Sequence, residues 1–361
     1  MKVLNVAETT KGGIETYFGS LSRSKKLKNE FLAVGYDISI IDITDKKSRL
    51  KNLLTLCYIL FFKVNLKSYD VIFLHSTFAG LLRILVYPYA KLFNIKVVYC
   101  SHGWAFDMEE DKKSFKNNLY IFTEKLLTHF SDIVFCISQS DLNSAYSAGL
   151  SKNKLVLNWN GVRASSVESS NETKARQTSN VKVLFVGRLD RQKGLYEFLT
   201  TIKSISHNLN KEIEFTIIGE PVRNDSPELY EVLDQAIDNV KIIQLGWVAN
   251  DNLDYYFKET DFVIVPSLWE GFGLIVAEAL RNGKPVFASA VGSLPFMLNS
   301  KTGWLFDAKD RASLEKNFKD VINKELYKKI SSEDCLNYFY ENFHEDIMNK
   351  NYLLNFEKLY A

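Results

Sequence analysis

Short runs of β-branched and aromatic residues alternate with longer helical patterns along the first half of the chain. These runs cover residues 2–6 (KVLNV), 38–43 (ISIIDI), 70–75 (DVIFLH), 96–101 (KVVYCS) and 132–138 (DIVFCIS). Strands that alternate with helices at this spacing form βαβ units. The pattern therefore predicts a buried parallel sheet.

The alternation stops between residues 163 and 180, where Ser, Thr and Asn predominate, and this composition indicates a linker. Apolar runs resume at 181–187, 214–219, 240–246, 261–267 and 285–290, which predict a second parallel sheet. We predict an α/β protein with a first domain at 1–165, a linker at 166–180, a second domain at 181–340 and a C-terminal helix at 341–361. The helical tail is expected to pack back on the first domain.

The composition agrees with two domains, since single cores stop growing at roughly 250 to 300 residues and the chain has 361. Hydrophobic residues make up 46% and charged residues 24%, as in globular enzymes. Residues 1–165 hold 22 Lys and Arg against 14 Asp and Glu, whereas the remainder holds 23 against 29. The basic first half suits an anionic surface or acceptor, although a chance imbalance of solvated charges explains it equally well.

Cysteine usage and hydropathy bear on localisation. The four cysteines are widely scattered and form no metal-binding pattern, which fits a reduced, cytoplasmic protein. Residues 1–6 read as a strand rather than as a secretory signal. The longest apolar run, residues 53–62, falls well short of the roughly 20 residues that a spanning helix needs.

The segment 266–280 (PSLWEGFGLIVAEAL) carries the strongest chemical signal. It follows an apolar strand, turns through Glu270 and two glycines, and enters a helix that contains Glu278. Glycines let a ligand approach the backbone, and the free N–H groups at a helix start attract phosphate. Carboxylates there can accept hydrogen bonds from vicinal sugar hydroxyls, whereas the alternative is that Glu278 only pairs on the helix surface.

A second motif, residues 186–195 (VGRLDRQKGL), lies between a predicted strand and a predicted helix. The Arg188 fork and the Lys193 point charge both suit phosphate oxygens. By itself this pattern also fits a solvated turn.

Gly12-Gly13 follow the first strand, and His102 follows the strand at 96–101. His75 is a second strand-end histidine, which we interpret as structural.

Together these motifs resemble the E-x7-E signature and the diphosphate-binding pair of the retaining glycosyltransferases of family 4, which have the GT-B fold of two Rossmann-like domains. The resemblance implies that Glu270 contacts donor-sugar hydroxyls, Glu278 the ribose, Arg188 and Lys193 the diphosphate, and His102 the transferred sugar. Residues 160–162 (NGV) resemble a family element at the end of the first domain, but Arg163 stands where an acidic residue is common. The implied catalytic residues are Glu270, His102, Arg188 and Lys193. The implied donor-binding residues are Gly12, Gly13, Arg188, Lys193, Gly219, Glu270, Gly271, Phe272, Gly273, Leu274 and Glu278.

The resemblance further implies a hexosyl transfer from a nucleotide sugar, preferentially a UDP-sugar, to a glycan or lipid-linked glycan of a bacterial surface polysaccharide. No Asp-x-Asp triplet follows a strand, and Glu109 to Asp111 read as exposed loop charges, so we expect a metal-independent enzyme without cofactor and without a nucleic-acid partner. Two other interpretations remain open: a nucleotide-sugar epimerase on the same architecture, and a non-catalytic sugar-nucleotide-binding module.

Membrane contact is a further hypothesis. Residues 22–28 (SRSKKLK) form a basic run in the first predicted helix, and the segments 53–62 and 80–93 add apolar and aromatic side chains. On one face these residues would dock on anionic lipid at the inner side of the plasma membrane. The opposing expectation is that apolar helices of a βαβ domain pack on their sheet.

Overall fold

The computed structural model describes residues 1–10, 13–46, 48–109, 111–165, 180–221 and 227–361. The chain divides into two compact units. The first unit comprises Met1–Arg163 together with Phe343–Ala361, and the second comprises Ala164–Asn342. The predicted linker, 166–180, lies outside the described residues except for Asn180.

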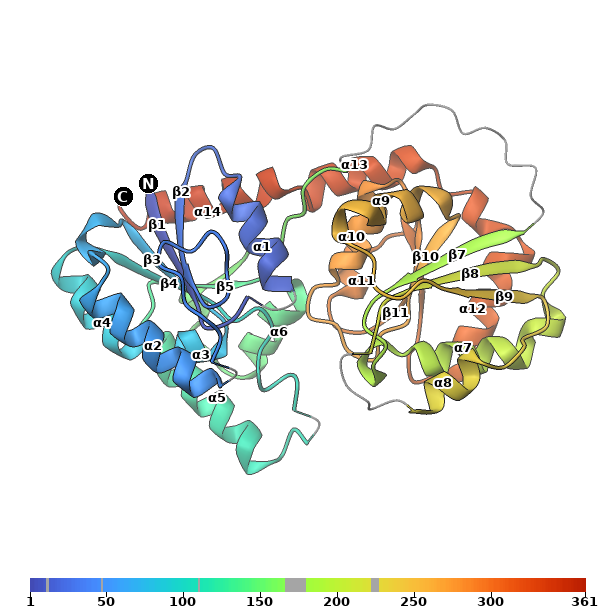
Figure 1. Cartoon of the computed structure of the whole chain (residues 1–361), viewed down its shortest axis with the longest axis horizontal. Coiled ribbons are helices and arrows are strands. Elements are labelled where there is room, and N and C mark those ends of the chain that lie inside the picture. Colours follow the sequence, from blue (N-terminus) through green and yellow to red (C-terminus); the bar gives the residue numbers. More distant parts are fainter. Residues whose placement is uncertain (11–12, 47, 110, 166–179, 222–226) are drawn as a thin grey trace. The chain divides into compact units, whose positions relative to one another are not determined.

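The first unit is built on a six-stranded sheet with the order β2-β1-β3-β4-β5-β6, in which every neighbouring pair is parallel (Figure 1). Its elements are β1 (Lys2–Ala7), α1 (Gly13–Ser22), β2 (Lys28–Ala33), α2 (Arg49–Phe62), β3 (Val71–His75), α3 (Thr77–Gly80), α4 (Arg83–Leu92), β4 (Lys96–Cys100), α5 (Phe115–Thr128), β5 (Ile133–Cys136), α6 (Gln139–Ser147), β6 (Leu155–Leu157) and α14 (Glu345–Lys358).

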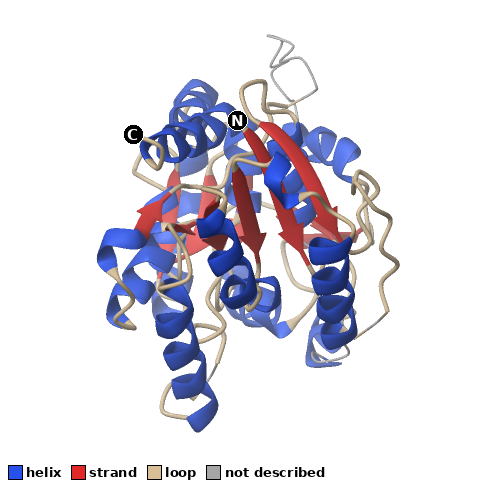
Figure 2. Cartoon of the chain, turned by 90° about the vertical axis from the view of Figure 1, so that its left-hand side faces the viewer, coloured by secondary structure: helices blue, strands red, loops and turns tan. Residues whose placement is uncertain are grey.

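Helices cover both faces of this sheet (Figure 2). Successive side chains of a strand point to opposite faces. Ile72 and Leu74 of β3 therefore join the buried cluster that includes residues of α2 and α4. Phe73, between them, points to the other face, where its ring lies 5.4 Å from that of Tyr352 in α14. The C-terminal helix is thus part of the first unit's core.

The sequence prediction was wrong for one strand of this sheet and missed two short strands of the protein. Residues 38–43 form no strand, and Ile38 and Ile40 are 59% and 41% exposed. The edge strand is instead β2, whose polar start (Lys28, Asn29, Glu30) hid it from a search for apolar runs. The three-residue β6 and, in the second unit, β12 were too short to stand out.

The second unit holds another six-stranded parallel sheet, with the order β12-β11-β10-β7-β8-β9 (Figure 1). Its elements are β7 (Val181–Val186), α7 (Leu195–Ile205), β8 (Ile213–Ile218), α8 (Pro227–Leu233), β9 (Val240–Gln244), α9 (Asn250–Glu259), β10 (Phe262–Val265), α10 (Leu274–Arg281), β11 (Val286–Ser289), α11 (Leu294–Met297), β12 (Gly303–Phe306), α12 (Arg311–Asn323) and α13 (Ser332–Asn342). A separate apolar cluster fills its interior, so each unit has its own core.

Candidate functional site

The direction in which the chain builds the second sheet changes between β7 and β10. From β7 the strands proceed outward to β8 and β9, and from β10 they proceed the other way to β11 and β12. In open α/β sheets, ligands bind at the carboxyl ends of the strands at such a switch point, because the two following loops diverge there. The loop after β7 carries Arg188 and Lys193, and the loop after β10 carries Glu270.

The structure brings Lys193 and Glu270 into direct contact. The Lys193 Nζ lies 2.8 Å from the Glu270 Oε2, and the Ser267 hydroxyl donates to the same oxygen over 3.1 Å. The two side chains are only 17% and 12% exposed. An ammonium group has three donors, so Lys193 can bind a further anion while it holds this carboxylate.

Arg188 is held by side chains of its own loop. Its Nη2 donates to the Gln192 Oε1 over 2.8 Å, and its Nε lies 3.3 Å from the Asp190 Oδ2. Gln192 in turn donates to the Trp269 carbonyl over 3.2 Å, which ties the loop after β7 to the loop after β10. The guanidinium stays about half exposed, so it has donors available for a ligand.

Glycines explain how close the Glu270 loop lies to its neighbours. A Cβ at Gly292 would lie 1.9 Å from the Glu270 carbonyl oxygen, so no larger residue fits there. Gly273 precedes α10 with a φ of 88°, a left-handed conformation that favours glycine. At Gly271, by contrast, a Cβ would meet only the Trp269 ring at 3.5 Å, an ordinary contact.

Phe272 and Leu274 complete this loop and the first turn of α10. The Phe272 side chain is buried, and its carbonyl accepts a hydrogen bond from the Ser293 hydroxyl. Leu274 is half-buried. The Phe272 side chain is therefore part of the packing beneath the loop.

Glu278 lies in α10, little more than one turn after the helix begins at Leu274. Burial raises the pKa of its carboxyl group to about 7, although nearby Arg281 opposes the shift. Arg281 itself is committed to Asp254, with its Nη2 at 2.7 Å from the Asp254 Oδ1. Glu278 is thus a carboxyl group poised to change charge near neutral pH.

The position directly after β8 has room only for a glycine, Gly219. Its φ is 146°, and a Cβ there would lie 1.8 Å from the Gly187 carbonyl oxygen. Its N–H donates to the Gly246 carbonyl over 2.8 Å, which joins the loops after β8 and β9. Beside this junction Trp247 is 68% exposed, and its N–H donates to the Glu220 Oε1 over 3.3 Å.

His102 lies in the first unit, directly after β4, with a φ of 57°. Its Nε2 lies 3.0 Å from the Nδ1 of His75, and its ring packs edge-on against Tyr17 with the centroids 4.6 Å apart. Gly13 is the first residue of α1, and Gly12 lies outside the described residues. The candidate residues therefore divide between the units, with only His102 and the early glycines in the first.

The NGV element has a structural explanation, and so has Ser138 at the end of the run 132–138. A Cβ at Gly161, in the NGV element, would lie 2.5 Å from the Glu345 Cα, so this glycine lets α14 approach. The Ser138 hydroxyl accepts from the Asp141 N–H and caps α6. Of the acidic loop charges, Glu110 lies outside the described residues, and Glu109 pairs with Lys116.

Sequence reasoning missed the residues that position the predicted ones. Asp190, Gln192 and Ser267 hold Arg188 and Glu270, but isolated Asp, Gln and Ser residues in loops carry no signal. Asp190 and Gln192 lie inside the motif 186–195, where their alternation with Arg188 and Lys193 was the available clue.

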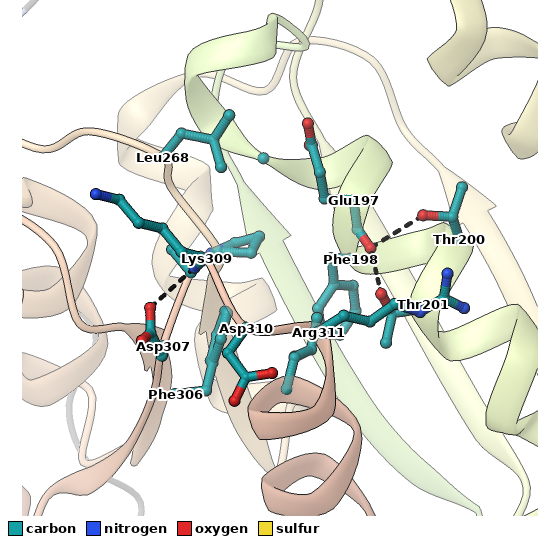
Figure 3. A pocket seen from close by; sticks show the side chains of 14 residues that line it. Glu197, Phe198, Thr200, Thr201, Leu268, Phe306, Asp307, Lys309, Asp310 and Arg311 are labelled. Atoms are coloured by element: carbon teal, nitrogen blue, oxygen red, sulfur yellow. Dashed lines mark hydrogen bonds between the residues drawn. The ribbon is translucent and has the colours of Figure 1, made fainter.

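A hollow of about 250 Å³ lies elsewhere in the second unit, between the start of α7 and the start of α12 (Figure 3). Its lining mixes Phe198 and Leu268 with the polar side chains Glu197, Lys309 and Arg311. Arg311 is engaged by Glu315 and by Ser204. None of the predicted site residues lines this hollow.

Comparisons with known proteins agree with this architecture. Residues 9–166 match the family Glycosyltransferase Family 4, and residues 167–338 match the family Glycosyl transferases group 1. A 41.2 kDa protein in the cps region of Klebsiella pneumoniae is 31% identical over 326 residues, which cover 86% of this chain and 87% of the relative. The UDP-Gal:α-D-GlcNAc-diphosphoundecaprenol α-1,3-galactosyltransferase of Escherichia coli is 26% identical, over 75% of this chain and 70% of the relative.

Among solved structures, Anabaena HepE in complex with UDP superposes with a TM-score of 0.77 at 16% identity, over 99% of this chain and 100% of HepE. This likeness concerns the fold. Two Rossmann-like units with parallel sheets place the chain in the GT-B class. The chain belongs to the family 4, or group 1, glycosyltransferases.

Proposed function

We propose that this glycosyltransferase transfers a hexosyl group, with retention of configuration, from a UDP-sugar to a lipid-linked glycan during the synthesis of a bacterial surface polysaccharide. The observation that carries the proposal is the Lys193–Glu270 pair at the switch point of the second sheet. The printed names of the relatives, a protein of a cps region and a galactosyltransferase acting on a diphosphoundecaprenol-linked sugar, support the acceptor class.

The proposed roles follow from the chemistry of each group. Arg188 and Lys193 bind the diphosphate, and Lys193 keeps Glu270 oriented while it does so. Glu270 accepts hydrogen bonds from hydroxyls of the donor sugar, and Glu278 accepts them from the ribose. Backbone N–H groups of Gly271 to Leu274 add positive potential at the start of α10.

The proposed mechanism is electrostatic stabilisation of the leaving group. As the sugar–phosphate bond breaks, negative charge grows on the diphosphate, and Arg188 and Lys193 are already in place to neutralise it. We propose that these cations, rather than a metal ion, provide the charge. The acceptor hydroxyl then attacks from the same face as the departing phosphate, which takes up its proton, so that the configuration is retained.

A nucleotide-release assay tests this function. Purified protein is screened with a panel of sugar nucleotides for thermal stabilisation, since a ligand that binds only the folded state raises its stability. The donor found in this way is then incubated with lipid-linked glycans while nucleoside diphosphate release is measured. Lys193→Ala and Glu270→Ala should each lower release at least about 100-fold, whereas Lys309→Ala, a lysine of the same unit outside the site, should not.

The same assay separates the rival interpretations. If an epimerised sugar nucleotide formed in the absence of an acceptor, the protein would be an epimerase and not a transferase. Nucleotide binding without turnover, for every acceptor tried, would indicate a binding module. Release that is unchanged in both Lys193→Ala and Glu270→Ala would refute the site assignment.

We also propose that the first unit contacts an anionic bilayer through the outer faces of α2, α4 and α5. Among the described helices, none has the length and apolar character needed to span a bilayer. Yet these three helices expose Leu50, Leu54, Tyr58, Phe62, Ile84, Leu85, Leu92, Phe115, Leu119, Phe122 and Leu126. Together the three helices contain a single acidic residue, Glu124, which is buried against Arg83.

This arrangement revises the expected docking surface. The basic run 22–28 is not helical, because α1 ends at Ser22 and Lys28 begins β2. The apolar segments 53–62 and 80–93 do form helices, and each keeps part of its apolar surface exposed. The helix α5 adds a stripe with a spacing of three to four residues, which is the period of one helix face.

A further inference from the structure

A chain of hydrogen bonds joins the candidate histidine, His102, to His75 and Asn5 at the switch point of the first sheet, between β1 and β3. The Nε2 of His102 lies 3.0 Å from the Nδ1 of His75, at the end of β3. The Nε2 of His75 lies 3.0 Å from the Oδ1 of Asn5 in β1. Asn5 and His75 are fully buried, whereas His102 is half-buried.

The environment of Asn5 fixes the direction of this chain. The Nδ2 of Asn5 donates to the Glu30 backbone carbonyl over 3.3 Å and to the Asn29 Oδ1 over 3.0 Å. A backbone carbonyl can only accept, so the amide nitrogen of Asn5 must face it. The Asn5 oxygen therefore faces His75, and the His75 Nε2 must carry a proton to donate to it.

Both imidazoles are neutral at physiological pH. Burial lowers the pKa of His102 to about 3 and lowers that of His75 well below its ordinary value. A neutral imidazole has one N–H and one bare nitrogen. Because His75 donates through Nε2, its Nδ1 is bare and accepts from the Nε2–H of His102. The Nδ1 of His102 is then bare.

The ring of His102 is also held in place from the other side. Tyr17 packs edge-on against it, and the Tyr17 hydroxyl donates to the hydroxyl of Tyr352 in α14 over 2.7 Å. The left-handed backbone of His102, at φ 57°, is uncommon for a residue with a side chain and persists where the surroundings enforce it. Among the described residues, none donates to the His102 Nδ1, so its lone pair can still accept a hydrogen bond.

We propose that His75 is a positioning residue that holds His102 in the Nε2–H tautomer, so that the bare Nδ1 of His102 accepts a hydrogen bond from a hydroxyl of the sugar substrate. The inference rests on the proposed function and on the role that the family resemblance implies for His102, contact with the transferred sugar. A protonated Nδ1 would instead donate, to a hydroxyl oxygen or to an anion, and could not accept from a hydroxyl hydrogen. This chain of hydrogen bonds from Asn5 through His75 to His102, which we call the relay, thus determines whether the Nδ1 of His102 accepts or donates. His75 acts through His102 without touching substrate.

Nuclear magnetic resonance of the ¹⁵N-histidine-labelled protein tests the tautomer directly, because bare and protonated imidazole nitrogens resonate far apart. We expect a bare Nδ1 and a protonated Nε2 for His102 in the wild type. The isosteric pair His75→Asn and His75→Leu separates the relay from packing, since both remove the ring but only Asn keeps an acceptor near the Nδ1 position. His75→Asn should retain the tautomer, whereas His75→Leu should give a mixture or the Nδ1–H form.

Activity gives the second readout. In His75→Leu, kcat for nucleoside diphosphate release should fall at least about 10-fold, and His75→Asn should recover most of the loss. Tyr352→Phe is the control for a lost buried hydrogen bond in the same core, and it should leave the His102 tautomer unchanged. If neither His75 variant folds, Asn5→Leu keeps both rings and removes only the acceptor that orients His75. It should also give a mixture of His102 tautomers or the Nδ1–H form.

The outcomes distinguish the relay from the proposed function. An Nδ1–H tautomer in the wild type, or an unchanged His102 spectrum in His75→Leu or in Asn5→Leu, would overturn the relay. If the tautomer responds as stated while no sugar nucleotide is turned over, the relay stands and the proposed transfer fails. If turnover is present and independent of the tautomer, the relay has no role in substrate binding.

Discussion

Single residues of the candidate site can lower stability, and Glu278 is the clearest example. Its pKa of about 7 means that the folded protein resists ionising a carboxyl group whose ordinary value is 4.5. Lys193 and Glu270, in contrast, neutralise each other. The sequence singled out all three residues as candidates, because their spacing is distinctive. It could not reveal that ionisation of Glu278 is unfavourable in the folded protein, since the burial of this side chain depends on the packing around α10.

Replacing Glu278 by Gln should stabilise the protein at pH 8 but not at pH 4. Below pH 4.5 the carboxyl is protonated in both states, so its removal changes nothing. Above pH 7 the carboxyl group is ionised in both states, and its burial in the folded state lowers the free energy of unfolding by at most about 3 kcal/mol. Gln carries no charge and removes this loss. Thermal unfolding at both pH values measures the difference, and Glu228→Gln, an exposed glutamate of α8, should show no pH-dependent gain.

The Lys193–Glu270 pair should show energetic coupling in the absence of ligand. Lys193→Met leaves a largely buried carboxylate with only the Ser267 hydroxyl, and Glu270→Gln leaves an ammonium without its counter-charge. The double variant removes both charges, so its loss of unfolding free energy should be smaller than the sum by about 1 kcal/mol. Additive losses in denaturant titrations would contradict a direct interaction.

Among the elements, the loops at the switch point of the second sheet depend on one another through backbone proximity. Gly292, after β11, lies against the Glu270 carbonyl, and Gln192 connects to the Trp269 carbonyl. The longer strands were predictable because their apolar runs are continuous. The edge strand β2 was not, since its first three residues are polar and only its last three are buried. The apolar run 38–43 forms no strand, and its Ile38 and Ile40 are exposed whereas Ile43 is buried.

Gly292→Ala should therefore damage the donor site from a distance. Its Cβ would lie 1.9 Å from the Glu270 carbonyl oxygen, and its φ is 52°. We expect a loss of more than about 2 kcal/mol in unfolding free energy together with weaker nucleotide-sugar binding, because the Glu270 loop must move. Gly271→Ala is the stability control, since its Cβ makes only an ordinary contact. Equal losses in the two variants would argue against the close approach.

The outer face of α5 is the element on which membrane binding can be tested most cleanly. Leu119→Ser with Phe122→Ser removes two side chains that are 50% and 65% exposed, so folding should be unaffected. We expect flotation with phosphatidylglycerol-containing vesicles at low salt to fall several-fold, because apolar burial anchors the helix. Tyr255→Ser, 62% exposed in the second unit, should float like the wild type. An unchanged double variant would refute the docking surface.

At the scale of the whole molecule, the first unit is assembled from both ends of the chain. The side chain of Arg23 donates three hydrogen bonds to Glu345, at 2.9, 3.1 and 2.7 Å. The rings of Phe135 and Tyr352 lie 4.7 Å apart. The sequence predicted that a tail beginning at residue 341 would return to the first domain, and the break falls two residues later, at Phe343, after α13 of the second unit.

Deleting residues 343–361 should unfold the first unit and leave the second intact. The deletion would uncover a face of the sheet that α14 buries, including Phe73 and Phe135. Limited proteolysis should then cleave within 1–163 and spare a fragment near 180–342. Adding the peptide 343–361 should restore protection, whereas a first unit that resists protease without it would contradict this dependence.

The return of the chain at Phe343 also sets an order of events on the ribosome. Residues up to Arg163 are synthesised before the second unit, yet the first unit lacks a complete α14 until the 195 residues 164–358 have been added. At about 5 to 20 residues per second this delay is roughly 10 to 40 s. During that interval the apolar face over Phe73 is exposed to solvent. The second unit, continuous in sequence, is synthesised completely within the same interval, so the part of the protein that starts first is the last to finish folding.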